Sequence, residues 1–219
     1  GSGKRMNSKV HKQYLIIQDR PVLYYSLKAF EDSAVDEIVL VVGKGEEEFC
    51  RKEIVDKYGI SKVKAIVEGG KERYHSVFEG LKQTSDADYV LIHDGARPFV
   101  NQEIIRRCML EVPEYQACVV GMPVKDTIKI ADEEGYAKQT PDRKNVWMIQ
   151  TPQTFSYALI YEAYEEMLKT EDTAITDDAM VLERIKGKKS KLIEGSYRNI
   201  KITTPEDLLI ANVYLQHPE

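Results

Sequence analysis

The chain has 219 residues, of which 42% are hydrophobic, and a formal net charge of −5 at pH 7. This length suits one large α/β domain or two small ones, and the apolar content is enough for a sizeable core. The negative charge argues against a nucleic-acid binder that relies on phosphate contacts, and no apolar run reaches the roughly 18–20 residues of a membrane span.

The chain opens with Gly-Ser-Gly-Lys-Arg, and Lys12 follows closely. A loop without bulky side chains lets its backbone N–H groups approach phosphate oxygens, and cations add charge-assisted donors. The opening residues therefore predict a phosphate cradle formed by Gly1, Ser2, Gly3, Arg5 and Lys12. The alternative is that Gly-Ser-Gly is the remnant of a cleaved tag, and these residues alone do not decide between the two.

Strand and helix patterns alternate along most of the chain. The aliphatic run at 37–42 is typical of a strand buried on both faces. Further strands are predicted at 63–67, 89–93, 117–122, 191–194 and 199–203, and helices at 21–30, 46–57, 72–83, 101–112, 156–168, 177–185 and 206–215. Because the connections are short, we predict an α/β fold with a doubly wound, mostly parallel sheet, as a single domain spanning residues 1–219.

The alternation breaks at residues 126–149, where short β-like pieces flank an acidic turn. This pattern predicts a hairpin that projects from the α/β body. Projecting apolar hairpins often pair with a second subunit, so the segment is a candidate dimerisation arm. The pattern fits a hairpin folded back on its own domain equally well.

Polar residues follow several of the predicted strands. Gly69 and Gly70 follow one strand, Asp94 and Arg97 follow the next, and Lys125 follows another. Ligands of doubly wound sheets bind beyond the carboxyl ends of the strands, so we expect these residues to share one rim. A rim rich in Arg and Lys suits phosphoryl or nucleotidyl transfer, in which the protein positions reactants and neutralises charge.

Histidine and cysteine show no pattern that indicates catalysis or metal binding. The four histidines are scattered, and ordinary surface or core roles are assigned to them. Cys50, Cys108 and Cys118 are odd in number and mostly far apart, which predicts free thiols in a reducing compartment. We therefore expect a cytoplasmic protein.

Five further motifs follow the opening loop and the run KQYL at 12–15. They are HDGARPF (93–99), PVKDTIK (123–129), QTPQ (150–153), TDDA (176–179) and NIKITTPED (199–207). With these motifs in this order, essentially the whole chain resembles the cytidylyltransferases that activate sugar-alcohol phosphates. The runs at 125–129, 142–143 and 194–196 resemble the branch that acts on 2-C-methyl-D-erythritol 4-phosphate more than the ribitol 5-phosphate branch.

The resemblance implies a Rossmann-like nucleotidyltransferase sheet and cytidylyl transfer from CTP to methylerythritol phosphate, in isoprenoid precursor biosynthesis. Arg5 and Lys12 match the catalytic cations of the family. The positions that match its CTP-binding residues are Gly1, Ser2, Gly3, Gly69, Gly70, Ser76, Asp94, Gly95 and Lys201. The positions that match its acceptor-binding residues are Arg97, Thr127, Arg143, Thr151 and Thr176.

The resemblance also implies partners. The arm with Thr127 and Arg143 would reach into the site of a second copy, so a homodimer is expected, with neither nucleic acid nor membrane as a partner. Mg²⁺ or another divalent cation would bridge the triphosphate, mostly through phosphate and water oxygens. Asp94 is the candidate protein contact for this metal, directly or through water.

The chain departs from the family pattern at a few positions. A buried strand precedes the position of Gly1 in the family, so we expect such a strand to lead into Gly1. Gly95 stands where alanine is common, Tyr74 where glutamine is common and His11 where proline is common.

Two alternatives stay open. One is a ribitol-type cytidylyltransferase, which would use the same CTP site and differ around Thr127 and Arg143. The other is a nucleotide-binding α/β module without catalysis, against which Arg5, Lys12 and Lys201 argue.

Overall fold

The computed structural model describes residues 11–170 and 174–217. Gly1, Ser2, Gly3 and Arg5 of the predicted cradle lie outside the described residues, as does the strand expected before Gly1. The helices are α1 (Val22–Glu31), α2 (Glu47–Cys50), α3 (Arg73–Leu81), α4 (Gln102–Tyr115), α5 (Tyr157–Met167), α6 (Asp178–Lys186) and α7 (Pro205–Gln216). A π-helical segment, η3 (Arg51–Asp56), continues α2, and η2 (Lys12–Tyr14) and η4 (Arg143–Asn145) are single 3₁₀ turns.

The strands form a central sheet and three smaller pairs. They are β1 (Ile16–Ile17), β2 (Arg20–Pro21), β3 (Ile38–Val42), β4 (Val63–Glu68), β5 (Tyr89–Ile92), β6 (Ala117–Pro123), β7 (Ile130–Ala131), β8 (Ala137–Gln139), β9 (Trp147–Ser156) and β10 (Lys191–Glu194). The central sheet has the order β10-β6-β9-β5, and β3 pairs with β4 in parallel. This mixed arrangement of helices and strands confirms the predicted α/β class.

Within the central sheet, β9 is the element that the sequence did not predict. It runs antiparallel to both β5 and β6, whereas β10 and β6 are parallel. The start of β9 lies within the segment 126–149 that is predicted to be the arm, and the pattern of residues 150–155 predicts no strand. The predicted strand at 199–203 is wrong, because this stretch is an irregular loop whose Ile202 N–H donates to the carbonyl of Ala96.

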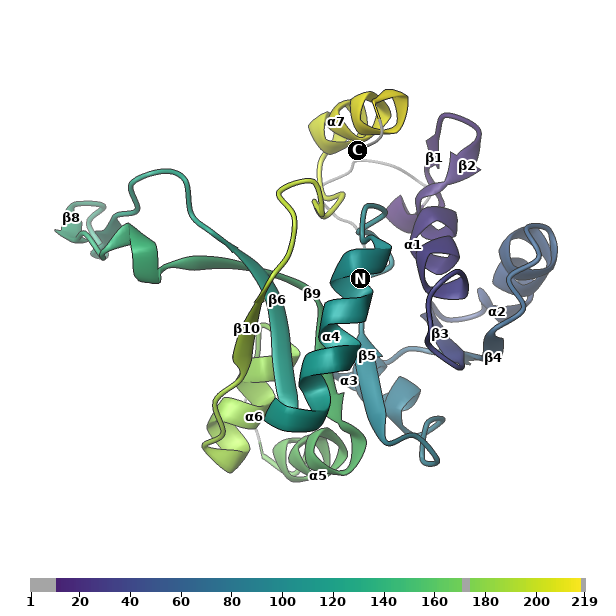
Figure 1. Ribbon diagram of the computed structural model, residues 1–219, viewed down its shortest axis with the longest axis horizontal. Coiled ribbons are helices and arrows are strands. Elements are labelled where there is room, and N and C mark those ends of the chain that lie inside the picture. The colour runs from purple at the N-terminus through teal and green to yellow at the C-terminus, as the bar shows by residue number, and fades with distance from the viewer. Residues whose placement is uncertain (1–10, 171–173, 218–219) are drawn as a thin grey trace.

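Helices cover both faces of the central sheet. The inner strand β6 is therefore buried on both of its faces. Ala117 and Val119 of β6 pack with α3, α5 and α6, while Cys118 and Val120 pack against α4. Figure 1 shows α4 lying in front of the sheet, with β6 and β9 behind it. A two-residue alternation with apolar side chains on both sides is the pattern expected of a strand between two helical layers.

The helix termini explain two successful sequence predictions. Asn101 caps α4, since its side chain accepts a hydrogen bond from the Ile104 N–H. Thr204 and Asp207 form a capping box at the start of α7, where Pro205 occupies the first turn. These caps fix the loops that enter the site.

The segment between β6 and β9 leaves the α/β body as a long excursion and carries β7 and β8 near its tip (Figure 1). Its side chains are mostly exposed, and Ile130 and Tyr136 remain 46% and 74% exposed. The role of this arm in dimerisation stays a prediction. In the part of the chain described above, no helix is both long and apolar enough to span a membrane.

Candidate active site

A cavity of about 310 Å³ lies at the rim where β5, β9 and the loop before α7 meet. Five of the predicted site residues line it: Asp94, Arg97, Thr151, Thr176 and Lys201. They come from four separate segments of the chain, which the fold brings together at the carboxyl end of β5. These five residues therefore share one rim, whereas Gly69, Gly70 and Lys125, which were expected on it, do not line the cavity, and ligand binding at this rim stays a prediction.

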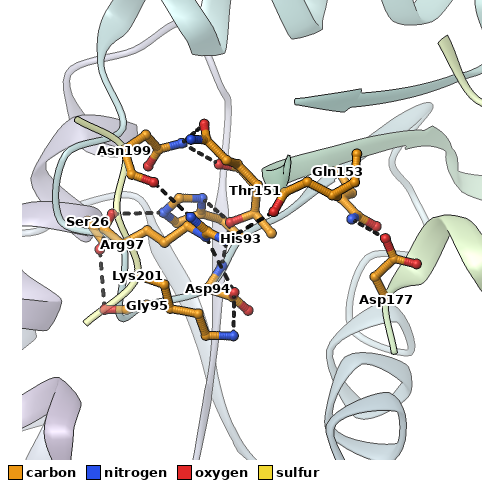
Figure 2. A network of polar contacts seen from close by, with 12 residues as sticks. Ser26, His93, Asp94, Gly95, Arg97, Thr151, Gln153, Asp177, Asn199 and Lys201 are labelled. Atoms are coloured by element: carbon orange, nitrogen blue, oxygen red, sulfur yellow. Dashed lines mark hydrogen bonds and ion pairs between the residues drawn. The ribbon is translucent and has the colours of Figure 1, made fainter. Parts of the chain in front are cut away.

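Asp94 is the centre of this group (Figure 2). Its carboxylate lies 2.8 Å from Lys201 Nζ, 3.5 Å from Arg73 Nε and 3.6 Å from Arg97 Nε. Burial alone would raise the pKa of this carboxyl, but the charges of Lys201 and Arg73 hold it well below its usual range. One anion thus holds three cations beside the cavity, where negatively charged ligand groups would meet them.

Arg97 is fixed by backbone carbonyls as well as by Asp94. Its Nη1 donates to the carbonyl oxygen of Asn199 at 2.7 Å, and its Nη2 lies 3.4 Å from that of Ile149. The Asn199 side chain, itself fully buried, donates to the carbonyl oxygen of Thr151. The loop at 199–203 thus uses its polar groups to position the arginine rather than to extend the sheet.

His93 and Thr151 support the Asp94 loop through hydrogen bonds. Thr151 Oγ1 accepts the Asp94 N–H at 3.1 Å and lies 3.0 Å from His93 Nδ1, while His93 Nε2 lies 3.2 Å from the carbonyl oxygen of Arg97. Burial lowers the pKa of His93 to about 4, so the ring is neutral at pH 7. With Nε2 protonated, every one of these bonds has a donor and an acceptor, and His93 is a structural support of the loop, as expected.

Arg73 and Asp178 form an ion pair that the sequence did not predict, although Asp178 belongs to the TDDA motif at 176–179. Arg73 Nη1 and Nη2 each lie 2.7 Å from one oxygen of Asp178, whose side chain is fully buried. Tyr164 Oη donates to the same carboxylate. Burial alone would lower the pKa of Arg73, but attraction to Asp178 raises it well above its usual range. This bidentate ion pair between Arg73 and Asp178 joins the start of α3 to the start of α6.

Gln153, the last residue of the QTPQ motif, was given no role from the sequence and holds the first turn of α6. Its Oε1 accepts the N–H groups of Asp178 and Ala179, and its Nε2 donates to Asp177. Asp177 in turn caps α6 through the Met180 N–H. Gln153 therefore sets the position of Thr176, the residue directly before this cap.

The predicted glycines lie where close packing requires them. A Cβ on Gly69 would lie 2.6 Å from Ser76 Oγ, and one on Gly70 would lie 2.4 Å from His75 Cβ, so both stay small beneath the start of α3. Gly95 is less restricted, because its Cβ would meet only the end of the Leu23 side chain at 2.9 Å. An alanine there, as is common in the family, needs only a small shift of Leu23.

Among the described residues, seven predicted site residues do not line the cavity: Lys12, Gly69, Gly70, Ser76, Gly95, Thr127 and Arg143. Lys12 lies on η2, while Thr127 and Arg143 lie exposed on the arm. Arg143 Nη1 donates to the carbonyl oxygen of Lys125 within the arm. The cavity of one chain thus lacks the two arm residues that the resemblance assigns to the acceptor.

The described residues do not form a cluster of ligands that would bind a metal ion by itself. Among the described residues, no three His, Cys, Asp or Glu side chains gather where they could hold a metal ion. The Asp94 carboxylate faces Lys201, Arg73 and Arg97, which compete with any cation for its oxygens. A divalent ion fits here only as part of a nucleotide complex, and contact with Asp94 stays a prediction.

Comparison with known proteins decides the family. The family model described as 2-C-methyl-D-erythritol 4-phosphate cytidylyltransferase matches residues 1–217. The chain belongs to this family. Membership confirms the predicted resemblance and the predicted class of enzyme, a nucleotidyltransferase that transfers a cytidylyl group.

Relatives with the same description match the chain over nearly all of its length. The chain is 53% identical to that of Lachnospira eligens over 218 residues, which is 99% of this chain and 96% of the relative. It is 50% identical to that of Lachnoclostridium phytofermentans over 216 residues, which is 99% of this chain and 93% of the relative.

Solved structures of this cytidylyltransferase family have the same fold. The 4-diphosphocytidyl-2C-methyl-D-erythritol synthase of Anaerococcus prevotii superposes with a TM-score of 0.87 at 37% identity, covering 97% of this chain and 93% of that one. The cytidylyltransferase of Thermus thermophilus gives a TM-score of 0.79 at 32% identity, covering 94% of each chain. The fold of the family is therefore shown for this chain.

Proposed function

We propose that this chain transfers the cytidylyl group of CTP to 2-C-methyl-D-erythritol 4-phosphate, giving 4-diphosphocytidyl-2-C-methyl-D-erythritol and pyrophosphate in isoprenoid precursor biosynthesis. The observation that carries the proposal is the cluster of Lys201, Arg73 and Arg97 around Asp94, inside a cavity lined by the family's motifs. Such a cluster suits a reaction between two phosphates, in which charge must be neutralised and the reactants aligned.

The acceptor phosphate attacks the α-phosphorus of CTP in line with the departing pyrophosphate. Because this phosphate is already ionised, no general base is needed, which agrees with a neutral His93 engaged in structural hydrogen bonds. Arg5 and Lys12 stabilise the negative charge on the α-phosphoryl group and on the leaving pyrophosphate. One such donor typically contributes about 10²–10³ in rate.

The remaining site residues bind and orient the two substrates. Gly69, Gly70 and Ser76 hold the cytidine, as the family resemblance implies, and a Cβ on either glycine would collide with Ser76 or His75 at the start of α3. Asp94, Gly95 and Lys201 lie on the phosphate side of CTP. Arg97, Thr151 and Thr176 hold the acceptor phosphate, which is consistent with their place around the cavity. The family assigns a further part of the acceptor pocket to Thr127 and Arg143.

A divalent cation such as Mg²⁺ would be carried by CTP rather than by a site of the protein, and when bound it would help to neutralise the triphosphate. Asp94 is the protein group that would contact it, directly or through water. The cations around Asp94 support an ion carried by CTP, because they leave that carboxylate little capacity for a further positive charge.

We further propose that the protein is a homodimer in which the arm of residues 126–149 completes the partner's cavity. The exposure of Ile130 and Tyr136 on the arm, and the absence of its Thr127 and Arg143 from the cavity of their own chain, support this arrangement. Cys50, Cys108 and Cys118 are free and buried, which supports a reducing, cytoplasmic location that cell fractionation would test.

A pyrophosphate-release assay tests the proposed reaction. CTP is offered with 2-C-methyl-D-erythritol 4-phosphate and, in parallel, with ribitol 5-phosphate. We expect kcat/KM for the methylerythritol phosphate to exceed that for ribitol phosphate by at least about 10²-fold, because differently shaped acceptors leave polar groups of the pocket unpaired. Preferential turnover of ribitol phosphate would assign the chain to the ribitol-type activity, and release with neither acceptor would leave a nucleotide-binding module.

A further inference from the structure

We propose that Glu46 is a positioning residue for cytidylyl transfer, which fixes the short turn that carries Lys12. The inference rests on the proposed function, because it assigns Glu46 a role that acts through the catalytic Lys12. Glu46 is not part of any motif that matches the family, and it lies outside the cavity around Asp94.

The Glu46 carboxylate binds both ends of the turn. His11 Nδ1 lies 2.6 Å from Glu46 Oε1, and Tyr14 Oη donates to Glu46 Oε2 at 2.7 Å. Between these two anchors lies η2, which begins at Lys12 and is closed by the Tyr14 N–H bond to the carbonyl oxygen of His11. One carboxylate therefore brackets the backbone of Lys12 from both sides.

Glu46 is itself held in place, so its carboxylate has a fixed position from which it anchors the turn that carries Lys12. The Gly43 N–H donates to Glu46 Oε2 at 2.9 Å, and a Cβ on Gly43 would lie 2.8 Å from the same oxygen. The Glu46 side chain is only 19% exposed. The turn that follows β3 thus presents the carboxylate in one orientation, at the same end of the strands as the site.

Tyr14 adds a second, apolar anchor. Its ring contacts Phe49 edge-on, with centroids 5.2 Å apart, and its Oη lies 3.0 Å from Cys50 Sγ. The ring also packs against the cluster of buried side chains between α1, α2 and β3. The chain after Lys12 is therefore tied to the core, and on the other side of Lys12 the turn is tied to Glu46 through His11, where the family commonly has proline.

The charge of Glu46 is essential to this arrangement. A carboxylate accepts through both oxygens, whereas the amide of glutamine has one acceptor oxygen and an NH₂ group that donates. Glu46→Gln therefore keeps the shape but removes the charge and one of the two accepting oxygens, so the amide can no longer accept from His11 on one side and from Tyr14 and Gly43 on the other. A misplacement of a catalytic group by about 1 Å costs up to about 10²-fold in rate.

The test compares full-length wild type, Glu46→Gln, Lys12→Ala and the double variant. We expect Glu46→Gln to lower kcat by about 10–100-fold, with KM for the acceptor changed by less than about threefold, because Lys12 acts mainly in the transition state. In the Lys12→Ala background, Glu46→Gln should lower kcat by less than about twofold. Additive losses in the double variant, or an unchanged kcat in Glu46→Gln, would overturn the inference.

Glu31→Gln is the matched control. Glu31 accepts the N–H groups of Ser61 and Lys62 at 3.0 and 2.9 Å, so it has the same bridging chemistry at a place remote from Lys12. We expect it to change the free energy of unfolding but not kcat. A loss of kcat equal to that of Glu46→Gln would mean that both act only through stability.

Hydrogen exchange gives a readout that does not depend on turnover. The amides of Tyr14 and Leu15, which close η2, should exchange at least about tenfold faster in Glu46→Gln than in wild type. Unchanged exchange at both amides would overturn the positioning role even if the proposed reaction were wrong. Failure of the proposed reaction shows separately, as absence of wild-type pyrophosphate release.

Discussion

Replacing Lys12 by alanine is expected to lower kcat for pyrophosphate release by about 10²–10³-fold. The proposed reaction places negative charge on the α-phosphoryl group as pyrophosphate leaves, and Lys12 is one of two cations assigned to that charge. KM for the acceptor should change little, because the lost interaction is made mainly in the transition state. Initial rates at saturating CTP and acceptor measure the effect.

Stability separates this effect from misfolding. The Lys12 side chain is not part of the buried core, so the free energy of unfolding of Lys12→Ala should stay close to that of wild type. Lys52→Ala, which removes a largely exposed lysine paired with Glu48, is the matched control and should keep full activity. Near-normal turnover in both Lys12→Ala and Arg5→Ala would contradict the assigned mechanism.

Replacing Asp94 by asparagine is expected to destabilise the protein by about 3–5 kcal/mol, the cost of removing one partner from a buried ion pair. The side chain of Asp94 is 16% exposed, and Lys201, Arg73 and Arg97 would be left facing one another without their anion. Urea unfolding of both proteins at pH 7 measures the difference. Asp86→Asn, which removes an exposed partner of Lys64, should change stability little.

The effect of Asp94 also depends on pH. Its folded-state pKa is lowered, so its contribution is fully present above the unfolded value of about 3.9 and is lost as the pH falls from there through the folded pKa. Wild type should therefore lose stability more steeply than Asp94→Asn below about pH 4. Parallel pH profiles for the two proteins would contradict the assigned ion pairs.

The rim of the site was predictable because it depends on local rules. Asp94 and Arg97 directly follow a strand, and ligands bind at the carboxyl ends of strands in this class of fold. The glycines at 69–70 were predicted for the same reason, and their tight packing beneath α3 explains why no larger residue stands there.

The buried pair between Arg73 and Asp178 could not be predicted from the sequence. Asp178 stands in the first turn of a helix, where an acidic residue is favourable for purely local reasons. Nothing in the sequence marks it as fully buried, and its partner is 105 residues away. Only the fold brings the two together.

Strand β9 was missed because its residues are polar. Thr151, Gln153 and Thr154 are at most 4% exposed, yet such residues usually indicate a loop. Hydrogen bonds to Asp94, Asp177 and the first turn of α6 satisfy Thr151 and Gln153. The reverse error at 199–203, where alternating apolar residues indicate a strand, arose because that backbone bonds to Arg97 and Ala96 instead.

The central claim is that the cavity of one chain and the arm of another together carry out cytidylyl transfer. Lys12→Ala and Arg143→Ala each damage one half of such a site, so both homodimers should be nearly inactive. Lys138→Ala, at an exposed position in β8 of the arm, should stay active and serves as the control.

Co-expression of Lys12→Ala and Arg143→Ala with two different tags, followed by assay of the mixture, tests this claim most directly. Random pairing makes half of the dimers mixed, and each mixed dimer has one intact site, so pyrophosphate release should recover to about a quarter of the wild-type rate. Full activity of Arg143→Ala alone, or no recovery in purified mixed dimers, would contradict the shared site.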